Sequence, residues 1–371
     1  MRVAMVCPYD LSRPGGVQGQ ALGLAHALRE AGHDALVVAP DDRPAGWATG
    51  HVYVAGRSVG ISTNGSVAPL ALSPLAAARA LKAVGEWRPD VVHLHEPLAP
   101  ILGYGFVTSR RWPMVATFHR SGIGGAYRLA GPLARRARAR IDVCCAVSEV
   151  ARSSAAWLCG GSYEVLFNGV DVDRFVRARH RVGAAREPAV LFLGRHEQRK
   201  GLEVLLRAFR QLASDDPATA AVLWVAGEGP ETASLRARYP ASGSIEWLGV
   251  VSDDDAADLM CRASVVCAPS LGGESFGMVV LEAMAAGAGV VASDIPGYRE
   301  AAAGHASLVP PGDVGALTGA LSGILLGEVD GEGRRAAALH AETWSLARLA
   351  DRYVDAYGRA VAHRGGIVAG Q

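Results

Sequence analysis

The sequence predicts an α/β protein built of two Rossmann-like parallel-sheet domains in series, with a ligand cleft between them. Short β-branched runs alternate with segments that carry apolar residues at helical spacing, and this alternation spans most of the chain. Strands joined by helices form βαβ units, which assemble into parallel sheets. The alternation restarts after a polar, Arg-rich stretch at about 174–188, and 371 residues suffice for two domains. Ligands of such sheets bind at the carboxyl ends of the strands.

The first domain is expected to cover residues 1–170. Its first strand is Val3–Cys7, and the following helix runs from Val17 to Ala31 and ends at Gly32. The remaining strands are expected at Leu36–Ala39, Val91–Leu94, Met114–Phe118, Val143–Val147 and Val165–Phe167, with helices near 74–85, 98–109, 126–139 and 149–159.

The second domain is expected to cover residues 171–345. Asp171-x-Asp173 is interpreted as a turn after Asn168-Gly169. A final helix near 344–362 lies beyond the second sheet, and residues 346–371 are expected to cross back to the first domain. Strands are expected at Val190–Leu193, Val222–Ala226, Ile245–Leu248, Val265–Ala268, Val290–Ala292 and Ser307–Val309, with helices near 201–213, 231–238, 253–262, 276–286, 297–303 and 313–326.

Composition excludes several classes of protein. A net charge of +1 gives no overall field that would attract nucleic acid or anionic lipid. The six cysteines lie mostly in apolar runs without a C-x-x-C pair, which favours buried thiols in a reducing cytosol. No 18-residue apolar run is free of Gly, Pro or charge, and the N-terminus enters a strand directly. We therefore expect a cytoplasmic protein, possibly one peripheral to the cytoplasmic face of the membrane.

The most informative motif is the loop Gly272–Gly277, which opens a helix that is otherwise apolar. Glu274 lies in this loop, and Glu282 follows eight residues later. A glutamate is almost never buried without a partner, so each carboxylate calls for a ligand or a specific mate. The free helix N-terminus beside them is an anion site, because its unsatisfied N–H groups and dipole favour negative charge. Carboxylates can accept hydrogen bonds from sugar hydroxyls, and the neighbouring backbone amides can bind phosphate. The combination favours a sugar nucleotide as the ligand.

Two cations follow a strand end in the same predicted domain. Arg195 comes directly after Gly194, and Lys200 precedes the next helix. Cations at this place can neutralise a leaving diphosphate. The alternative is a solvated pair, since His196 and Arg199 also occur here.

The first strand is followed by a glycine loop, Gly15-Gly16, which opens the first helix. Two glycines allow backbone amides to approach a phosphate without interference from a Cβ. A plain turn is the alternative for this loop. The loop is not G-x-G-x-x-G, although Asp41 and Asp42 leave a nicotinamide site as a minor alternative.

His119 ends the strand Met114–Phe118 and is a candidate to hydrogen-bond a sugar or support developing charge. The alternative is a histidine on a surface loop. His93 and His95 share one strand face, but no carboxylate or cysteine completes a metal set with them, so no metal site is predicted. No cofactor is required by the sequence, Mg²⁺ dependence stays open, and no G-x-S-x-G nucleophile elbow is present.

Taken together, these motifs resemble the retaining glycosyltransferases of family four, which have the GT-B fold. The resemblance covers nearly the whole chain, and within the family it is strongest to the actinobacterial phosphatidylinositol mannosyltransferases. It is carried by Pro14-Gly-Gly-Val17, Ala116-Thr-Phe-His119, Asn168-Gly-Val-Asp171, Gly194-Arg195 to Lys200-Gly201, and Glu274 to Glu282, together with Met5-Val-Cys-Pro-Tyr9 and His95-Glu-Pro97.

The resemblance implies transfer of a hexose from a nucleotide sugar, with mannose from GDP-mannose favoured, onto a phosphatidylinositol-like lipid or a polyol. It implies that His119, Arg195, Lys200 and Glu274 are catalytic, with same-face attack guided by the leaving phosphate. The implied donor-binding residues are Gly16, Arg195, Lys200, Glu274, Ser275, Phe276, Gly277 and Glu282, and the implied acceptor-binding residues are Tyr9, Gln18, Asn64 and Ser66.

The acceptor side departs from the pattern of these relatives. Pro69 stands where the resemblance implies a phosphate-binding arginine, and Pro74–Trp87 is less basic than a membrane-facing helix should be. Arg128, Arg135, Arg136, Arg138 and Arg140 could form a compensating basic patch, and the alternative is an ordinary exposed helix face. Two alternatives therefore stay open. One is another GT-B enzyme, a phosphorylase, an epimerase or a transferase that uses a UDP-sugar and a soluble acceptor, and the other is a non-catalytic sugar-nucleotide binder.

Overall fold

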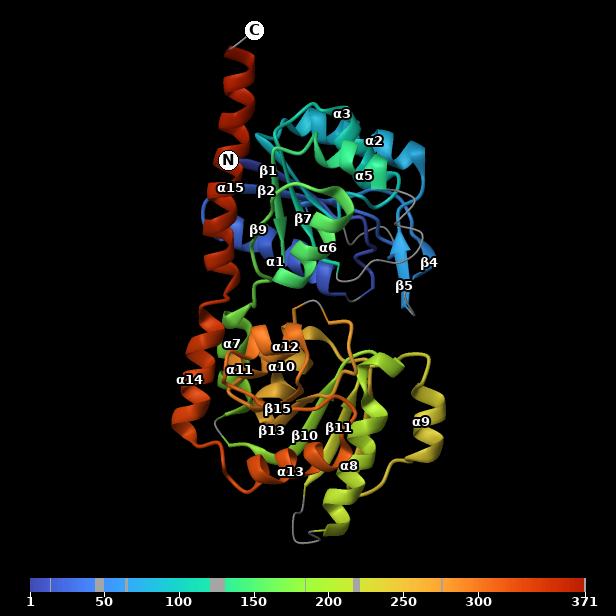
Figure 1. Ribbon diagram of the computed structural model, residues 1–371, viewed down its shortest axis with the longest axis vertical. Helices are drawn as coiled ribbons and strands as arrows, with labels where there is room; N and C mark the ends of the chain where they lie inside the picture. Colours follow the sequence, from blue (N-terminus) through green and yellow to red (C-terminus); the bar gives the residue numbers. More distant parts are fainter. Residues whose placement is uncertain are drawn as a thin grey trace. The chain divides into compact units, whose positions relative to one another are not determined.

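The computed structural model describes residues 1–13, 15–43, 50–63, 66–120, 131–183, 185–215, 221–274 and 276–369. The chain folds into two compact units (Figure 1). Unit 1 comprises Met1–Gly169 together with Leu346–Gln371, and unit 2 comprises Val170–Ser345.

Unit 1 is built on a parallel sheet in which, among the described residues, seven strands follow the order β3-β2-β1-β6-β7-β8-β9. The central strands are buried along their length, as expected for a parallel sheet covered on both faces. The order reverses between β1 and β6, which makes this pair the topological switch point. The strands are β1 (Arg2–Val6), β2 (Asp34–Ala39), β3 (Val52–Val54), β6 (Val91–His95), β7 (Met114–Phe118), β8 (Val143–Ala146) and β9 (Glu164–Val165).

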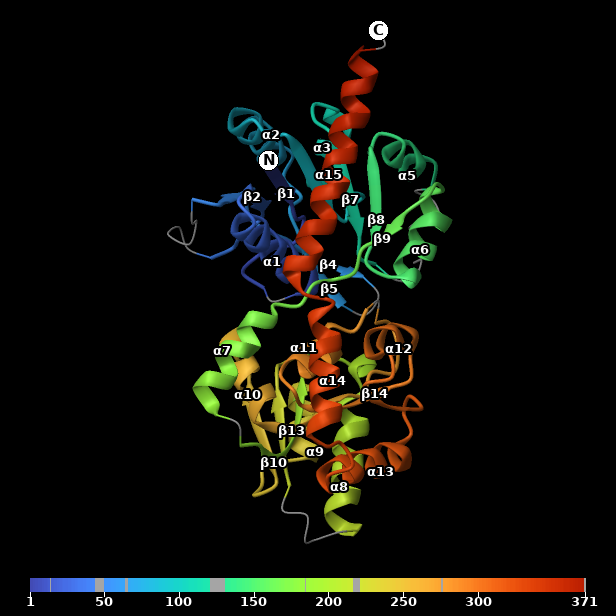
Figure 2. The ribbon, with the colours of Figure 1, turned by 90° about the vertical axis from the view of Figure 1, so that its left-hand side faces the viewer.

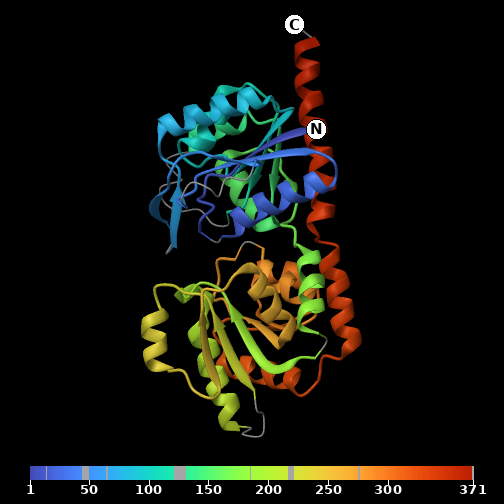
Figure 3. The same ribbon diagram turned by 180° about the vertical axis from the view of Figure 1, so that it is seen from behind.

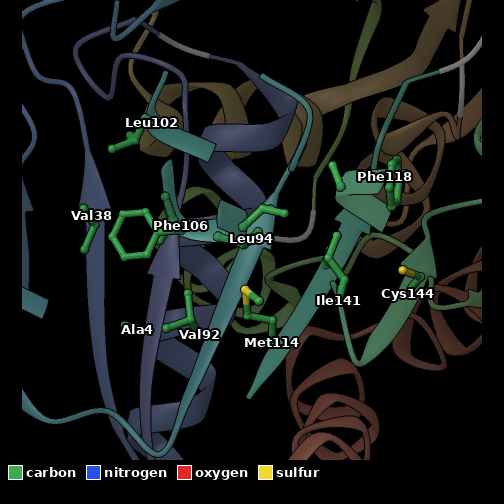
Figure 4. Close-up of a cluster of buried hydrophobic side chains, with 14 of the residues drawn as sticks. Ala4, Val38, Val92, Leu94, Leu102, Phe106, Met114, Phe118, Ile141 and Cys144 are labelled. Carbon is green, nitrogen blue, oxygen red and sulfur yellow. The ribbon is translucent and has the colours of Figure 1, made fainter. Parts of the chain in front are cut away.

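Helices cover both faces of this sheet. α2 (Pro74–Trp87), α3 (Leu102–Ser109), α5 (Gly131–Arg138) and α6 (Glu149–Cys159) contribute to the core on one face. Figure 4 shows part of that core, including Val92, Leu94 and Phe106. The other face is covered by α1 (Gly16–Glu30) and by the chain's last helix, α15 (Leu346–Ala369), which contact each other (Figure 2).

An antiparallel hairpin of β4 (Val59–Thr63) and β5 (Ser66–Leu70) stands apart from the main sheet of unit 1. It contacts the loop after β1, because Tyr9 forms a bridge with Leu70 and the amide of Asp10 donates to the Pro69 carbonyl at 3.1 Å. The hairpin therefore holds that loop.

Unit 2 is built on a second parallel sheet, with six strands in the order β12-β11-β10-β13-β14-β15 over the residues described. Here the order reverses between β10 and β13. The strands are β10 (Glu187–Leu193), β11 (Val222–Ala226), β12 (Ile245–Gly249), β13 (Ala263–Ala268), β14 (Gly289–Ser293) and β15 (Ser307–Val309).

The helices of unit 2 also divide between the faces of its sheet. α8 (Leu202–Asp215), α9 (Thr232–Arg238) and α13 (Val314–Leu325) contribute to the core on one face, and α8 packs on α13 (Figure 3). α7 (Val172–Val182), α10 (Asp253–Arg262), α11 (Met278–Ala285) and α14 (Gly331–Glu342) form a second set of packed helices. A 3₁₀ turn, η1 (Gln198–Lys200), precedes α8, and α12 (Pro296–Ala302) follows β14.

This architecture confirms the predicted α/β class of two Rossmann-like parallel sheets. Two local predictions were wrong. The stretch at 174–188 is not simply a polar connection, because α7 begins it and buries Phe175 and Ala178. Asp171 is not a plain turn residue either, since its side chain caps α7 by accepting from the Arg174 amide at 3.0 Å. The sequence also did not predict β3, the hairpin or α14.

Among the described residues, no helix has both the length and the apolar character needed to cross a membrane.

Candidate functional site

The switch point of unit 2 brings together two loops that lie far apart in the sequence. The loop after β10 carries Arg195 and Lys200, and the loop after β13 carries Glu274. Their close approach requires a glycine. Gly201 has φ +68°, and a Cβ there would lie 2.0 Å from the Pro269 carbonyl oxygen.

Glu274 is held by cations from the neighbouring loop. Its Oε1 lies 2.6 Å from Lys200 Nζ and accepts from Arg199 Nη1 at 2.8 Å, while only 15% of its side chain is exposed. Burial alone would raise the pKa of this carboxyl, but the charges and hydrogen bonds of Lys200 and Arg199 lower it below its ordinary value. Glu274 is therefore ionised at neutral pH, and one of its two partners, Lys200, is a cation that was expected to bind a diphosphate.

Glu197 extends this contact set into a row of alternating charges. Its side chain is only 4% exposed, and its two oxygens lie 3.2 Å from Arg195 Nε and 3.0 Å from Arg199 Nε. We call the resulting set the charged row: Arg195, Glu197, Arg199, Glu274 and Lys200. Glu197 was not predicted from the sequence, and Arg199 was considered only as part of a solvated group of cations. The i, i+2, i+4 alternation of Arg195, Glu197 and Arg199 was the available signal.

The rest of the glycine loop anchors itself in unit 2. Phe276 is 2% exposed and its ring packs on Trp344 at 5.1 Å between centroids, so its side chain belongs to the core. Gly277 has φ +96° and is the N-cap residue of α11, where it supplies no side-chain cap. Ser275 lies outside the described residues.

Glu282 on α11 has a different partner from Glu274. Its Oε1 lies 3.3 Å from Arg174 Nη2 of α7, a residue that the sequence analysis left in a polar connection. Burial raises the pKa of Glu282 to about 7, although Arg174 acts in the opposite direction. The two glutamates of the motif therefore have opposite electrostatic environments.

In unit 1, His119 follows β7 and contacts the end of β6. Its Nε2 lies 2.9 Å from His95 Nδ1, and its backbone amide donates to Glu96 Oε1 at 2.7 Å. His119 is 8% exposed, so it is not the surface-loop histidine of the alternative interpretation. The contact arises because β6 and β7 are neighbours, with His95 in register with Thr117.

Burial determines the charge of this histidine. It lowers the pKa of His119 to about 3, although a hydrogen bond with the side chain of Asn168 acts in the opposite direction. At neutral pH the ring is therefore an uncharged imidazole. It can orient a hydroxyl by hydrogen bonding, but it cannot offer a positive charge to the departing group.

The other unit 1 candidates lie near the loop after β1. Gly16 begins α1 and a Cβ there would meet nothing within 4 Å, so its surroundings are open. Gln18 is buried, and its Nε2 donates to the carbonyls of Asp10 and Arg13, each at 3.2 Å, so its amide nitrogen holds the loop. Asn64 lies outside the described residues. Ser66 begins β5, where only its backbone is described.

In the described ranges, no group of three His, Cys, Asp or Glu side chains is arranged to hold a metal ion. Asp41, which left a nicotinamide site open, is paired with Arg43 at 2.6 Å.

Comparisons with known proteins agree with the resemblance seen in the sequence. Residues 14–174 match the family model described as Glycosyltransferase Family 4, and residues 187–326 match the model described as Glycosyl transferases group 1. A phosphatidyl-myo-inositol mannosyltransferase of Mycolicibacterium smegmatis is 40% identical over 330 residues, 88% of this chain and 85% of that protein. One from Propionibacterium freudenreichii subsp. shermanii is 35% identical over 81% of this chain and 79% of that protein.

Solved structures share the fold. Sucrose-phosphate synthase from Thermosynechococcus elongatus superimposes with a TM-score of 0.72 at 20% identity, covering 98% of this chain and 99% of that one. Anabaena Alr3699/HepE in complex with UDP-glucose gives 0.71 at 19% identity, covering 96% and 99%. The predicted family and the GT-B fold are thereby confirmed. The chain belongs to glycosyltransferase family four, in the group of the phosphatidyl-myo-inositol mannosyltransferases.

Proposed function

We propose that this glycosyltransferase transfers mannose from GDP-mannose to the inositol of a phosphatidylinositol-type lipid, with retention of configuration. The observation that carries the proposal is the charged row at the switch point of unit 2. The names of the relatives that are 35–40% identical to this chain support the choice of sugar and acceptor.

The charged row is suited to bind a diphosphate and release it. Arg195 is 47% exposed, Arg199 36% and Lys200 21%, so these cations can reach an anionic ligand while buried Glu197 limits how far two of them turn. When a diphosphate binds, it competes with Glu274 for Lys200 and Arg199. The freed carboxylate then accepts hydrogen bonds from hexose hydroxyls, and the cations stabilise the negative charge that develops on the leaving group.

Other residues take the roles that the family resemblance gives them. Gly16 would offer its amide to the donor phosphates, and Glu282 would accept from the ribose hydroxyls. His119, as a neutral imidazole, would exchange its hydrogen bond with the Asn168 side chain for one with the reacting sugar or the acceptor. Same-face attack by the acceptor hydroxyl, guided by the leaving phosphate, requires these groups only to position the reactants and needs no nucleophile from the protein.

We further propose that unit 1 contacts the membrane surface peripherally while it binds the lipid. A cavity of about 540 Å³ lies among α2, α3 and α5, with Leu81, Tyr104 and Leu133 in its lining. Leu133 is 54% exposed, and Leu75, which follows the lining residue Pro74 in the sequence, is 61% exposed. Arg135 and Arg136 on α5 are exposed as well, and each cation near an anionic surface contributes about 1 kcal/mol.

A donor screen followed by a transfer assay tests the proposal. Each of GDP-mannose, UDP-glucose and UDP-N-acetylglucosamine is added at equal concentration, and the change in Tm is measured. A ligand at 100 times its Kd stabilises the folded state by about 2.7 kcal/mol, so the preferred donor gives the largest shift. We expect this donor to be GDP-mannose, with labelled mannose then transferred to phosphatidylinositol in vesicles, and the protein sedimenting with those vesicles.

Other results would select the alternatives. A larger shift with a UDP-sugar, or transfer to a soluble polyol but not to the lipid, would overturn the assigned donor or acceptor. Release of sugar 1-phosphate in the presence of inorganic phosphate would indicate a phosphorylase. Donor binding without turnover on any acceptor would indicate a non-catalytic binder. A protein that stays in the supernatant in the presence of vesicles would overturn the membrane contact alone.

A further inference from the structure

A row of buried polar side chains joins α15 to the central strands of unit 1. Tyr357 Oη lies 2.8 Å from His93 Nδ1, and His93 Nε2 lies 2.7 Å from Thr117 Oγ1, which in turn lies 2.7 Å from Tyr353 Oη. These side chains are at most 2% exposed. Both ring nitrogens of His93 therefore have hydrogen-bond partners, and these bonds help to hold α15 on the sheet.

His95 stands one step further along the same face of β6, and its bonding is not complete. Its ring stacks on that of His93 with centroids 4.4 Å apart, and its Nδ1 meets His119 Nε2 at 2.9 Å. Its Nε2 is buried and has no hydrogen-bond partner among the residues that the structure describes. Leaving a buried polar atom unpaired costs about 1–3 kcal/mol, so this ring orientation carries a cost to stability.

The residue after His95 has a second energetically unfavourable feature, and it also involves a contact with His119. Glu96 has φ +49°, a left-handed conformation that strains a residue with a Cβ by roughly 1–3 kcal/mol. In this conformation its Oε1 accepts the amide of His119 at 2.7 Å. Two consecutive residues at the end of β6 thus hold the ring and the backbone of His119, each at a cost to stability.

We propose that His95 is a positioning residue that fixes the orientation and the tautomer of the His119 ring. This proposal extends the proposed function, because it matters for catalysis only if His119 contacts the reacting sugar or the acceptor. The geometry that supports it is the direct ring-to-ring hydrogen bond between His95 and His119, together with the unpaired Nε2 of His95.

The tautomer follows from the bonding. A neutral imidazole has one N–H donor and one acceptor nitrogen, so a bond between two rings fixes both tautomers together. Burial lowers the pKa of both His95 and His119 far below 6.5, and both rings are neutral. A buried N–H without a partner is rarer than a buried lone pair without one, so the proton of His95 is assigned to Nδ1, which faces His119, and not to Nε2. His119 Nε2 then accepts, and the N–H of His119 is on Nδ1. His95 then donates from its own Nδ1, and its orphaned Nε2 carries a lone pair.

The first test needs no substitution. The chain is labelled with ¹⁵N-histidine, and long-range ¹H–¹⁵N correlation spectra report which ring nitrogen is protonated, with His119 assigned by comparison with His119→Gln. We expect the Nδ1–H tautomer for both His95 and His119. An Nε2–H tautomer at His119 would overturn the proposal, whatever the activity of the protein.

Variants then test the positioning itself. His95→Leu removes the donor, and we expect His119 to lose its single Nδ1–H signature and kcat to fall about threefold, with the donor KM changed less than twofold. His95→Asn keeps an N–H donor near the place of Nδ1 and should restore much of both. Thr117→Val is the matched control: it removes a buried hydroxyl from the adjacent strand, and it should lower Tm but leave the His119 signals unchanged.

The outcomes separate the two proposals. An unchanged His119 tautomer in a folded His95→Leu protein, or unchanged kcat despite an altered tautomer, would overturn the positioning role. If the wild-type spectra and the His95 variants behave as expected but no mannosyl transfer occurs, the proposed function fails and the control of the His119 tautomer stands. If His95→Leu does not fold, the wild-type tautomers and His95→Asn still decide the matter.

Discussion

At the carboxyl ends of their central strands, the two units carry opposite kinds of polar chemistry. Unit 2 gathers alternating charges whose cations stay partly exposed, from 21% for Lys200 to 47% for Arg195. Unit 1 gathers His93, His95 and His119, which are at most 8% exposed and which burial keeps neutral. The difference follows from solvent access, because burial raises the free energy of an ion strongly but costs little for a neutral ring that is hydrogen-bonded.

This difference indicates that the two units have different roles in binding and catalysis. Partly exposed cations can exchange one anionic partner for another, so the charged row of unit 2 can take up and release a diphosphate. Neutral imidazoles in a fixed network cannot stabilise an anion as ions do, but they present a donor or an acceptor in a defined direction. The predictions below test whether charge matters in one unit and orientation in the other.

The largest effect is expected from Glu274→Gln, which keeps the shape of the side chain but removes its charge. Lys200 and Arg199 lose the carboxylate that holds them, and the hexose loses a charged acceptor. Loss of one preorganised group of this kind lowers kcat by about 10²–10³-fold. Steady-state kinetics measure the loss, and circular dichroism shows whether the fold is retained.

Glu203→Gln is the matched control for this prediction. Glu203 pairs with Arg238 in an ion pair whose side chains are 42% and 50% exposed, and such surface pairs contribute little. We expect unchanged kinetics in this variant. Full activity in Glu274→Gln would refute the assignment of the charged row to the donor.

A smaller effect is expected on stability, from Glu282→Gln. The pKa of Glu282 is raised from 4.5 to about 7 in the folded state by burial. Between these pH values the folded protein keeps a proton that the unfolded chain releases. The stabilising contribution is therefore fully present below about pH 4.5 and is lost as the pH rises through 7, on the order of 3 kcal/mol in total.

Glutamine cannot titrate, so the variant should lack this component. Urea unfolding at pH 5 and at pH 8 measures this component. The free energy of unfolding of Glu282→Gln minus that of the wild type should be larger at pH 8 than at pH 5. An equal difference at both pH values would mean that Glu282 titrates normally, and that the contrast with Glu274 is absent.

The strands and the class of fold could be predicted because buried parallel strands are nearly continuous apolar runs. Met114–Phe118 and Val222–Ala226 have the predicted bounds without change. α7 was missed because only Phe175 and Ala178 of its residues are buried, while the arginines around them resemble a solvated connection. In α14 a Gly-Glu-Gly start conceals the helix, although Asp330 caps it.

The candidate site could be predicted residue by residue but not contact by contact. Glu274 and Lys200 can be recognised as motif residues. Their 2.6 Å contact, however, depends on β10 and β13 being neighbours, and local sequence patterns do not determine the order of strands in a sheet. The same holds for His95 and His119, whose contact follows from the pairing of β6 with β7. Tyr357 contacts His93 and Tyr353 contacts Thr117, although more than 230 residues separate the members of each pair. No local sequence pattern predicts these contacts.

The sharpest test of the contrast between the units compares Lys200→Met with His119→Gln in the binding of GDP, the proposed leaving product. Lys200→Met removes a charged donor, and a hydrogen bond to a charged group contributes about 1.5–3 kcal/mol. The Kd for GDP should therefore rise by about 10- to 100-fold in calorimetry. His119→Gln replaces a neutral ring by a neutral amide. It should change this Kd less than twofold and lower kcat by about 3- to 10-fold, the value of one neutral hydrogen bond. If His119→Gln weakened GDP binding as much as Lys200→Met does, the imidazole would take part in binding the diphosphate, and the separation of charge from orientation would not hold.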